Sequence, residues 1–133
     1  MLTSIDRLMI ATDDLEQAEN QCMALLGRSP SWAGEYPGVG TRHVLFCLAN
    51  TRIELLAPSE ETESNAGLRA HLEEHGPGLY GLALETGDLG AVIDEMRKAD
   101  TVLEAPVSLL ARDDASGAYR RLLQADLPTT LSR

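Results

Sequence analysis

The sequence predicts an α+β domain made of two copies of one β-α-β-β-β module. A short register of residues recurs 74 positions along the chain: Thr12, Asp14 and Leu15 reappear as Thr86, Asp88 and Leu89. An alternating apolar stretch precedes the register in each copy, and an apolar pattern of helical period follows it. Each copy therefore begins with a strand, a tight turn and a helix.

The size and composition of the chain fit one compact domain. With 133 residues, of which 44% are hydrophobic, the chain can bury one core. Its 21 acidic and 11 basic residues give a net charge of −10, so neither nucleic acid nor an anionic membrane is an expected partner. No secretory leader pattern and no membrane-spanning apolar run is present in the sequence, which predicts a cytoplasmic protein.

The first module opens with an alternating strand over about residues 3–11. Asp13 then stands three residues before Glu16, which is the spacing of a capping box at a helix start. Apolar residues at helical spacing predict a helix from about Asp14 to Leu26, and Gly27 ends it in a left-handed cap.

A segment rich in proline and glycine follows this helix. Residues 29–40 contain two prolines and three glycines, which predicts a short strand followed by a mobile loop. Trp32 and Tyr36 fall in that loop. There they serve either as a lid over a pocket or as contacts in a dimer.

The rest of the chain completes module one and builds module two. The expected strands and helices are a hairpin at 41–48 and 51–57, a linker helix within 59–77, a strand at 79–85, a helix from 89, and strands at 107–111 and 118–124. Residues 127–133 carry little strand pattern, so the last strand of module two is expected to be missing. One domain, 1–133, thus divides into module one at about 3–58, the linker helix, and module two at about 78–133.

Five stretches of the chain resemble, in order, the motifs of the vicinal oxygen chelate superfamily. They are IDRL at 5–8, DDLEQA at 13–18, LLG at 25–27, RIELLAP at 52–58 and GPGLYGLA at 76–83. This family includes glyoxalase I, methylmalonyl-CoA epimerase, extradiol dioxygenases and bleomycin-resistance proteins. The resemblance implies paired modules whose curved mixed sheets form a cup, commonly in a homodimer.

The same resemblance implies where a divalent metal would be bound in the cup. The ligand of the first strand falls on Arg7, that of the fourth strand on Glu54, and that of the second module's first strand on Gly81. The last ligand would lie on the strand expected to be missing. Only Glu54 is chemically suitable, and the charge of Arg7 would lie where the dication belongs. We therefore expect no metal cofactor here, with a divalent metal as the alternative.

Two function classes follow from this reading. The favoured one is a metal-independent binding protein of the glyoxalase and bleomycin-resistance type, which holds a hydrophobic or carbonyl-containing small molecule. Its expected ligand-binding residues are Arg7, Trp32, Tyr36, His43, Glu54 and Gly81. The alternative is a glyoxalase- or epimerase-like lyase or isomerase, with Glu54 as general base and Arg7 or His43 stabilising an oxyanion.

Strand alternation also predicts what replaces the metal. Arg7 points away from the face that carries Leu8 and Ile10, and Glu54 points away from that of its own apolar neighbours, so both face the cup. A buried carboxylate needs a partner, and an arginine fork matches it. We expect an Arg7–Glu54 ion pair, and a homodimer that covers the sheet edge left by the missing strand.

Overall fold

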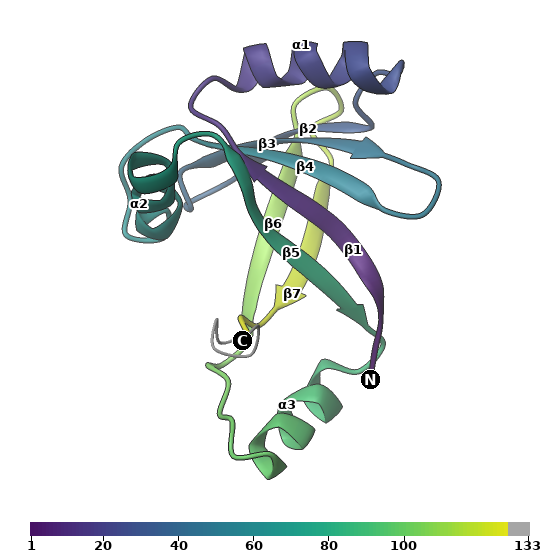
Figure 1. Cartoon of the computed structure of the whole chain (residues 1–133), viewed down its shortest axis with the longest axis vertical. Coiled ribbons are helices and arrows are strands. Elements are labelled where there is room, and N and C mark those ends of the chain that lie inside the picture. Colours follow the sequence, from purple (N-terminus) through teal and green to yellow (C-terminus); the bar gives the residue numbers. More distant parts are fainter. Residues whose placement is uncertain (128–133) are drawn as a thin grey trace.

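The structure, a computed structural model that describes residues 1–127, is a curled sheet of seven strands with three helices (Figure 1). The strands are β1 (Leu2–Ala11), β2 (Trp32–Tyr36), β3 (Thr41–Cys47), β4 (Arg52–Pro58), β5 (Gly78–Thr86), β6 (Val107–Asp113) and β7 (Tyr119–Gln124). The helices are α1 (Leu15–Leu26), α2 (Ala66–His75) and α3 (Leu89–Lys98). The expected α+β class is confirmed, and so are the hairpin, the linker helix and the two late strands.

The sheet joins both modules into one continuous surface, in the order β5-β1-β4-β3-β2-β6-β7. β1 and β4 are parallel, and the other neighbours are antiparallel. Figure 1 shows β1 with β5, and β6 with β7, running away from the layer of β2, β3 and β4 on the side opposite α1. The sheet therefore curls around a concave side, which we call the cup.

The repeated register forms the same local structure in both modules. The Thr12 hydroxyl accepts the backbone N–H of Asp14 at 3.1 Å, and the Thr86 hydroxyl accepts that of Asp88 at 3.1 Å. Each aspartate side chain then accepts the backbone N–H three residues later, at 3.1 and 3.0 Å, and so caps its helix. The two strand-to-helix junctions are thus structural equivalents, as the repeat predicts.

The start of α1 corrects the expected capping box by one residue. The N-cap is Asp14, with extended backbone angles, whereas Asp13 is exposed. The hydroxyl of Thr12 holds the backbone N–H of Asp14, which leaves the Asp14 carboxylate aimed at the first turn. The end of the helix is as expected, because Gly27 adopts the left-handed conformation with φ 65°.

The expected mobile loop holding Trp32 and Tyr36 is wrong. Residues 32–36 form β2, which pairs with β3 on one side and with β6 on the other. Gly34 reflects close packing rather than mobility, since a Cβ there would lie 1.6 Å from the backbone oxygen of Arg112. A lid made from this segment is therefore ruled out, and both aromatic residues are part of the sheet.

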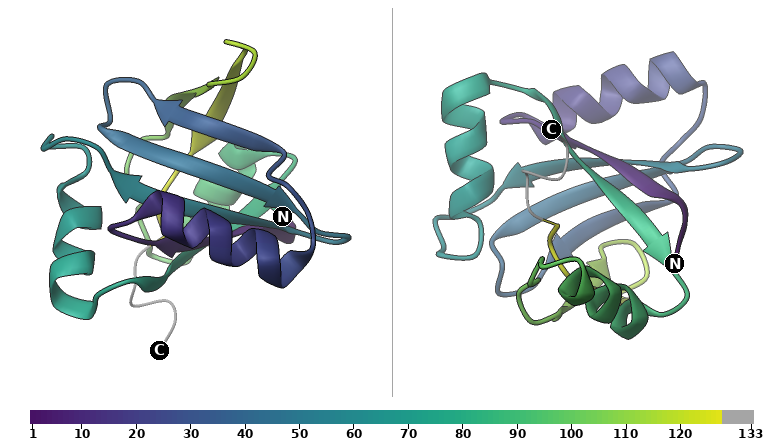
Figure 2. Two further views of the ribbon diagram at one scale, coloured as in Figure 1. Left: turned by 90° about the horizontal axis from the view of Figure 1, so that it is seen from above. Right: turned by 60° about the horizontal axis from the view of Figure 1, so that its bottom comes forward.

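Two hydrophobic clusters lie on opposite faces of the sheet. Val44, Phe46 and Leu55 pack beneath α1, which covers one face of the sheet in Figure 2 (left). The second cluster lines the cup and contains Ala11, Tyr36, Leu56, Leu68 and Ala111. Alternation along β4 places Leu55 against the helix and Glu54 and Leu56 toward the cup.

Module two supplies β5, α3, β6 and β7 within the described residues. The expectation that its last strand is missing concerns residues 127–133, which lie outside the described residues except for Leu127. No helix within residues 1–127 is long and apolar enough to cross a membrane.

Candidate ligand site in the sheet cup

A buried ion pair connects the first and fourth strands at the cup. Nε of Arg7 on β1 donates to Oε1 of Glu54 on β4 at 2.8 Å. Arg7 is 6% exposed and Glu54 is 1% exposed. The two strands are parallel neighbours, with Glu54 opposite Met9, so the side chains meet diagonally. The expected Arg7–Glu54 pair is confirmed.

Two further side chains complete this network. Arg7 also donates from Nη1 to Oδ2 of Asp6 at 2.7 Å, and the Tyr36 hydroxyl donates to Oε2 of Glu54. Burial alone would lower the pKa of Arg7, but the charge and hydrogen bond of Glu54, together with Asp6, outweigh it and raise that pKa. Burial and the charge of Glu54 raise the pKa of Tyr36. The network therefore consists of a charged arginine, a carboxylate with both oxygens engaged, and a protonated phenol.

His43 lies beside this network in the centre of the sheet. Its ring stacks on Tyr36 with centroids 4.2 Å apart, and the residue is 0% exposed. Burial lowers the pKa of His43 to about 4, and the charges of Arg120, Arg42 and Arg7 act in the same direction against that of Glu54. The imidazole is therefore neutral at pH 7. Neither of its ring nitrogens has a hydrogen-bond partner within residues 1–127.

Trp32 and Arg120 face the same side from β2 and β7. The guanidinium carbon of Arg120 lies 5.6 Å from the centre of the Trp32 ring, which is a cation–π contact. Nε1 of Trp32 and Nε of Arg120 are buried, and neither has a hydrogen-bond partner in the described chain. Sequence reasoning missed Arg120, although alternation with Leu122, a cup residue two positions on, was a signal for it.

Gly81 lies on β5 opposite Met9 of β1. A Cβ at Gly81 would lie 3.1 Å from the terminal methyl of Met9, so the methionine occupies the space beside the glycine. Among the six expected site residues, hydrogen bonds join Arg7, Tyr36 and Glu54. His43 stacks on Tyr36, and Trp32 contacts Arg120 instead of another expected residue. Gly81 contributes no side chain.

The donor set in the cup does not fit a divalent metal. Transition-metal sites use three or four side-chain ligands. Here both oxygens of Glu54 already accept hydrogen bonds, and a guanidinium cation lies 2.8 Å from one of them. Within residues 1–127, no group of three or more His, Cys, Asp and Glu side chains is arranged to hold a metal ion.

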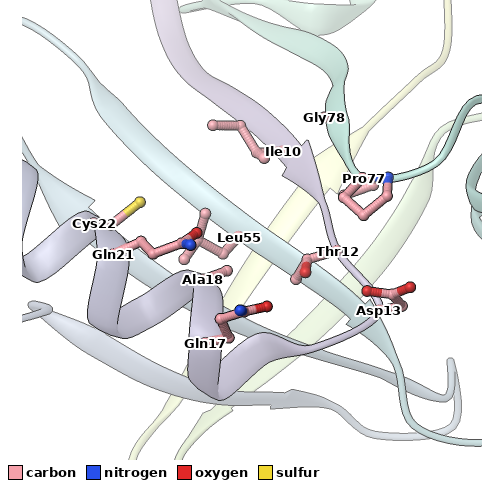
Figure 3. A pocket seen from close by; sticks show the side chains of 11 residues that line it. Ile10, Thr12, Asp13, Gln17, Ala18, Gln21, Cys22, Leu55, Pro77 and Gly78 are labelled. Atoms are coloured by element: carbon pink, nitrogen blue, oxygen red, sulfur yellow. The ribbon is translucent and has the colours of Figure 1, made fainter.

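A cavity of about 270 Å³ lies between α1 and the end of β1, on the other face of the sheet (Figure 3). Gln17, Gln21 and Cys22 of α1 line it together with Ile10 and Pro77. Ile10 belongs to the cluster beneath the helix, whereas the neighbouring Met9 packs against the cluster in the cup. This cavity is therefore separate from the Arg7–Glu54 network.

Comparisons with a family sequence model and with individual proteins point to the same family. Residues 6–118 match the sequence model of the Glyoxalase/Bleomycin resistance protein/Dioxygenase superfamily. An ethylmalonyl-CoA/methylmalonyl-CoA epimerase from Cereibacter sphaeroides is 31% identical over 100 residues, which are 74% of this chain and 72% of that protein.

Solved structures of similar fold include methylmalonyl-CoA epimerases. That from Mycobacterium tuberculosis aligns with a TM-score of 0.72 at 24% identity, covering 99% of this chain and 93% of that chain. A variant of the Streptomyces coelicolor enzyme, in complex with 2-nitronate-propionyl-CoA, aligns with a TM-score of 0.70 at 20% identity, covering 92% of this chain and 94% of that one.

Proposed function

Because the chain belongs to the Glyoxalase/Bleomycin resistance protein/Dioxygenase superfamily, we propose that it binds a small molecule in the sheet cup without a metal ion. The observation that carries this proposal is the Arg7–Glu54–Tyr36 network. It uses both carboxylate oxygens of Glu54 and places a permanent cation where the resemblance implies a dication.

The lining of the cup supports a ligand with apolar and carbonyl groups. Met9, Leu109 and Leu122 are half-buried there and provide apolar contact. Trp32 and His43 add polar ring atoms that are not used by the protein within residues 1–127. Acyl-CoA thioesters, the compound class named for the similar epimerases, combine these properties and are suitable probes.

The test is calorimetric titration of the purified protein with methylmalonyl-CoA, with EDTA and again with added Co²⁺. We expect one dissociation constant under both conditions, and a change in the emission of Trp32, the only tryptophan of the chain. Binding that requires the metal, or metal that co-purifies in stoichiometric amount, would contradict the proposal. Arg7→His is the matched variant, because it removes the cation and adds an imidazole, and it should bind Co²⁺ more tightly than the wild type.

An epimerase-like isomerase is the second candidate, favoured by the 31% identity to the Cereibacter sphaeroides epimerase. In this function Glu54 takes the proton from the carbon next to the thioester carbonyl, and Arg7 or His43 stabilises the resulting enolate oxygen. Glu54 would first have to release the hydrogen bond from Tyr36 or from Arg7.

Hydrogen exchange separates the two functions. Methylmalonyl-CoA incubated with the protein in D₂O takes up deuterium at this carbon if the protein is an isomerase, and mass spectrometry detects the added mass. Exchange above the protein-free rate that is lost in Glu54→Gln would support the enzyme. Binding without such exchange would leave only the binding function.

A further inference from the structure

Four buried polar atoms without a hydrogen-bond partner lie in the cup. Within residues 1–127 they are Nδ1 and Nε2 of His43, Nε1 of Trp32 and Nε of Arg120. More than nine-tenths of buried polar groups in proteins are hydrogen-bonded, and a buried polar group without a partner destabilises the fold. Four such atoms on one face of a sheet indicate a site whose partner is a bound molecule.

The four atoms belong to one location although they come from three strands. Arg120 of β7 lies over the ring of Trp32 of β2. The charge of Arg120 also acts on Tyr36 and on His43, whose rings stack on each other. The unpaired atoms thus belong to side chains that neighbour one another on the cup side of the sheet, near the Arg7–Glu54 network.

The chemistry of these atoms specifies the kind of partner. The indole N–H and the guanidinium N–H only donate, so they need an acceptor. The guanidinium is also a cation, and its strongest partners are paired anionic oxygens. A neutral imidazole offers one hydrogen-bond donor and one acceptor, so His43 can bond to an uncharged polar group of the same ligand.

We infer that the ligand of the cup carries a carboxylate, whose oxygens accept hydrogen bonds from Nε of Arg120 and Nε1 of Trp32. This inference rests on the proposed binding function and adds the charge of the ligand and the residues that recognise it.

Arg7 does not provide the same recognition, although it is a cation in the same cup. It already pairs with Glu54 at 2.8 Å and Asp6 at 2.7 Å. Arg120 forms no ion pair within residues 1–127, in a chain whose net charge is −10. A half-buried arginine left without a carboxylate in so acidic a chain is available for the carboxylate of a ligand.

The experiment compares two thioesters that differ only in the carboxylate. Methylmalonyl-CoA carries a carboxylate where isobutyryl-CoA carries a methyl group, and calorimetry with EDTA measures both dissociation constants. We expect the wild type to bind methylmalonyl-CoA about tenfold or more tightly, because a hydrogen bond to a charged group contributes about 1.5–3 kcal/mol. Arg120→Gln should remove this preference by weakening only methylmalonyl-CoA.

Two other variants make the result specific. Trp32→Phe keeps an aromatic ring but removes the indole N–H, and it should reduce the same preference. Arg121→Gln is the matched control, because Arg121 is the next residue of β7 and is exposed. It should bind both thioesters like the wild type. Thermal unfolding checks that each variant is folded.

The possible results distinguish this inference from the function on which it rests. Equal affinity for the two thioesters in the wild type, or an unchanged preference in Arg120→Gln and Trp32→Phe, would overturn the carboxylate inference and leave metal-free binding intact. If the protein binds neither thioester and does not bind methylmalonate alone, both the carboxylate inference and the proposed binding function are overturned.

Discussion

The pairing of Arg7 with Glu54 is the residue-level feature that distinguishes this cup. Both charges are buried, so each needs the other, and Asp6 and Tyr36 use much of the remaining hydrogen-bonding capacity. The pair lies on the cup side of the sheet, near the side chains of Trp32, His43 and Arg120, whose buried ring and guanidinium nitrogens have no hydrogen-bond partner within residues 1–127.

Removing one member of the pair should destabilise the protein strongly. Arg7→Met leaves Glu54 buried without its cation, and we expect a loss of about 3–5 kcal/mol in the free energy of unfolding, measured with urea. The double variant Arg7→Met, Glu54→Leu removes both charges and should recover much of that loss. A single variant as stable as the wild type would contradict the prediction.

His43 should make the free energy of unfolding depend on pH at values above those at which carboxylates usually titrate. Its pKa is about 4 in the folded chain against an ordinary value of 6.5, so the unfolded chain binds the proton first as the pH falls. The free energy of unfolding therefore decreases from pH 6.5 to pH 4, by about 3 kcal/mol in total from this group. Urea unfolding at pH 7 and pH 4.5 measures the decrease, which His43→Gln should reduce. An unchanged slope in that variant would show that other groups cause it.

At the scale of single elements, the repeated strand-to-helix junction is the clearest unit. Thr12 and Asp14 in the first copy match Thr86 and Asp88 in the second, down to the hydrogen bonds they make. In each junction the free backbone N–H groups at the helix start are hydrogen-bonded by side chains only a few positions away. The sequence register alone is therefore enough to specify the junction.

The two neighbouring aspartates at the start of α1 provide a matched test. Asp14→Ala should cost about 1 kcal/mol of unfolding free energy, because it removes the acceptor for the backbone N–H of Gln17 at 3.1 Å. Asp13→Ala, at an exposed position beside the cap, should change stability by less than about half of that. Equal losses of unfolding free energy in both variants would contradict this, because they would show that both aspartates cap the helix.

At the scale of the whole molecule, the two outer strands of the described sheet come from module two. In module one, β4 lies between β1 and β3, parallel to the first and antiparallel to the second. The same arrangement in module two would place a strand between β5 and β7, which are the ends of the sheet order. Both strands carry exposed apolar side chains there, namely Leu82, Leu84, Tyr119 and Leu123.

A homodimer remains our prediction for how these edges are covered. Light scattering at high micromolar concentration should give about twice the 14.4 kDa chain mass. Leu123→Lys on β7, where the residue is 63% exposed, should weaken the dimer, whereas Val102→Lys, 76% exposed between α3 and β6, should not. A clean monomer of the wild-type chain would contradict this prediction.

The sequence by itself determined the parts of the protein that depend on near neighbours. The repeated register predicted both helix starts, and the alternation of strands predicted that Arg7 and Glu54 meet, because side-chain direction follows from position in a strand. Only the misplaced cap at Asp13 was wrong at this level, by one residue.

The tertiary structure decided what depends on distant parts of the chain. The segment of Trp32 and Tyr36 is a strand because β6, more than 70 residues later, pairs with it and approaches Gly34 closely. Arg120 joins the cup because β7 pairs with β6, which itself pairs with β2, and the guanidinium of Arg120 reaches over the ring of Trp32. Proline and glycine content reports local backbone preference, whereas pairing between distant strands is set by how the whole sheet is assembled.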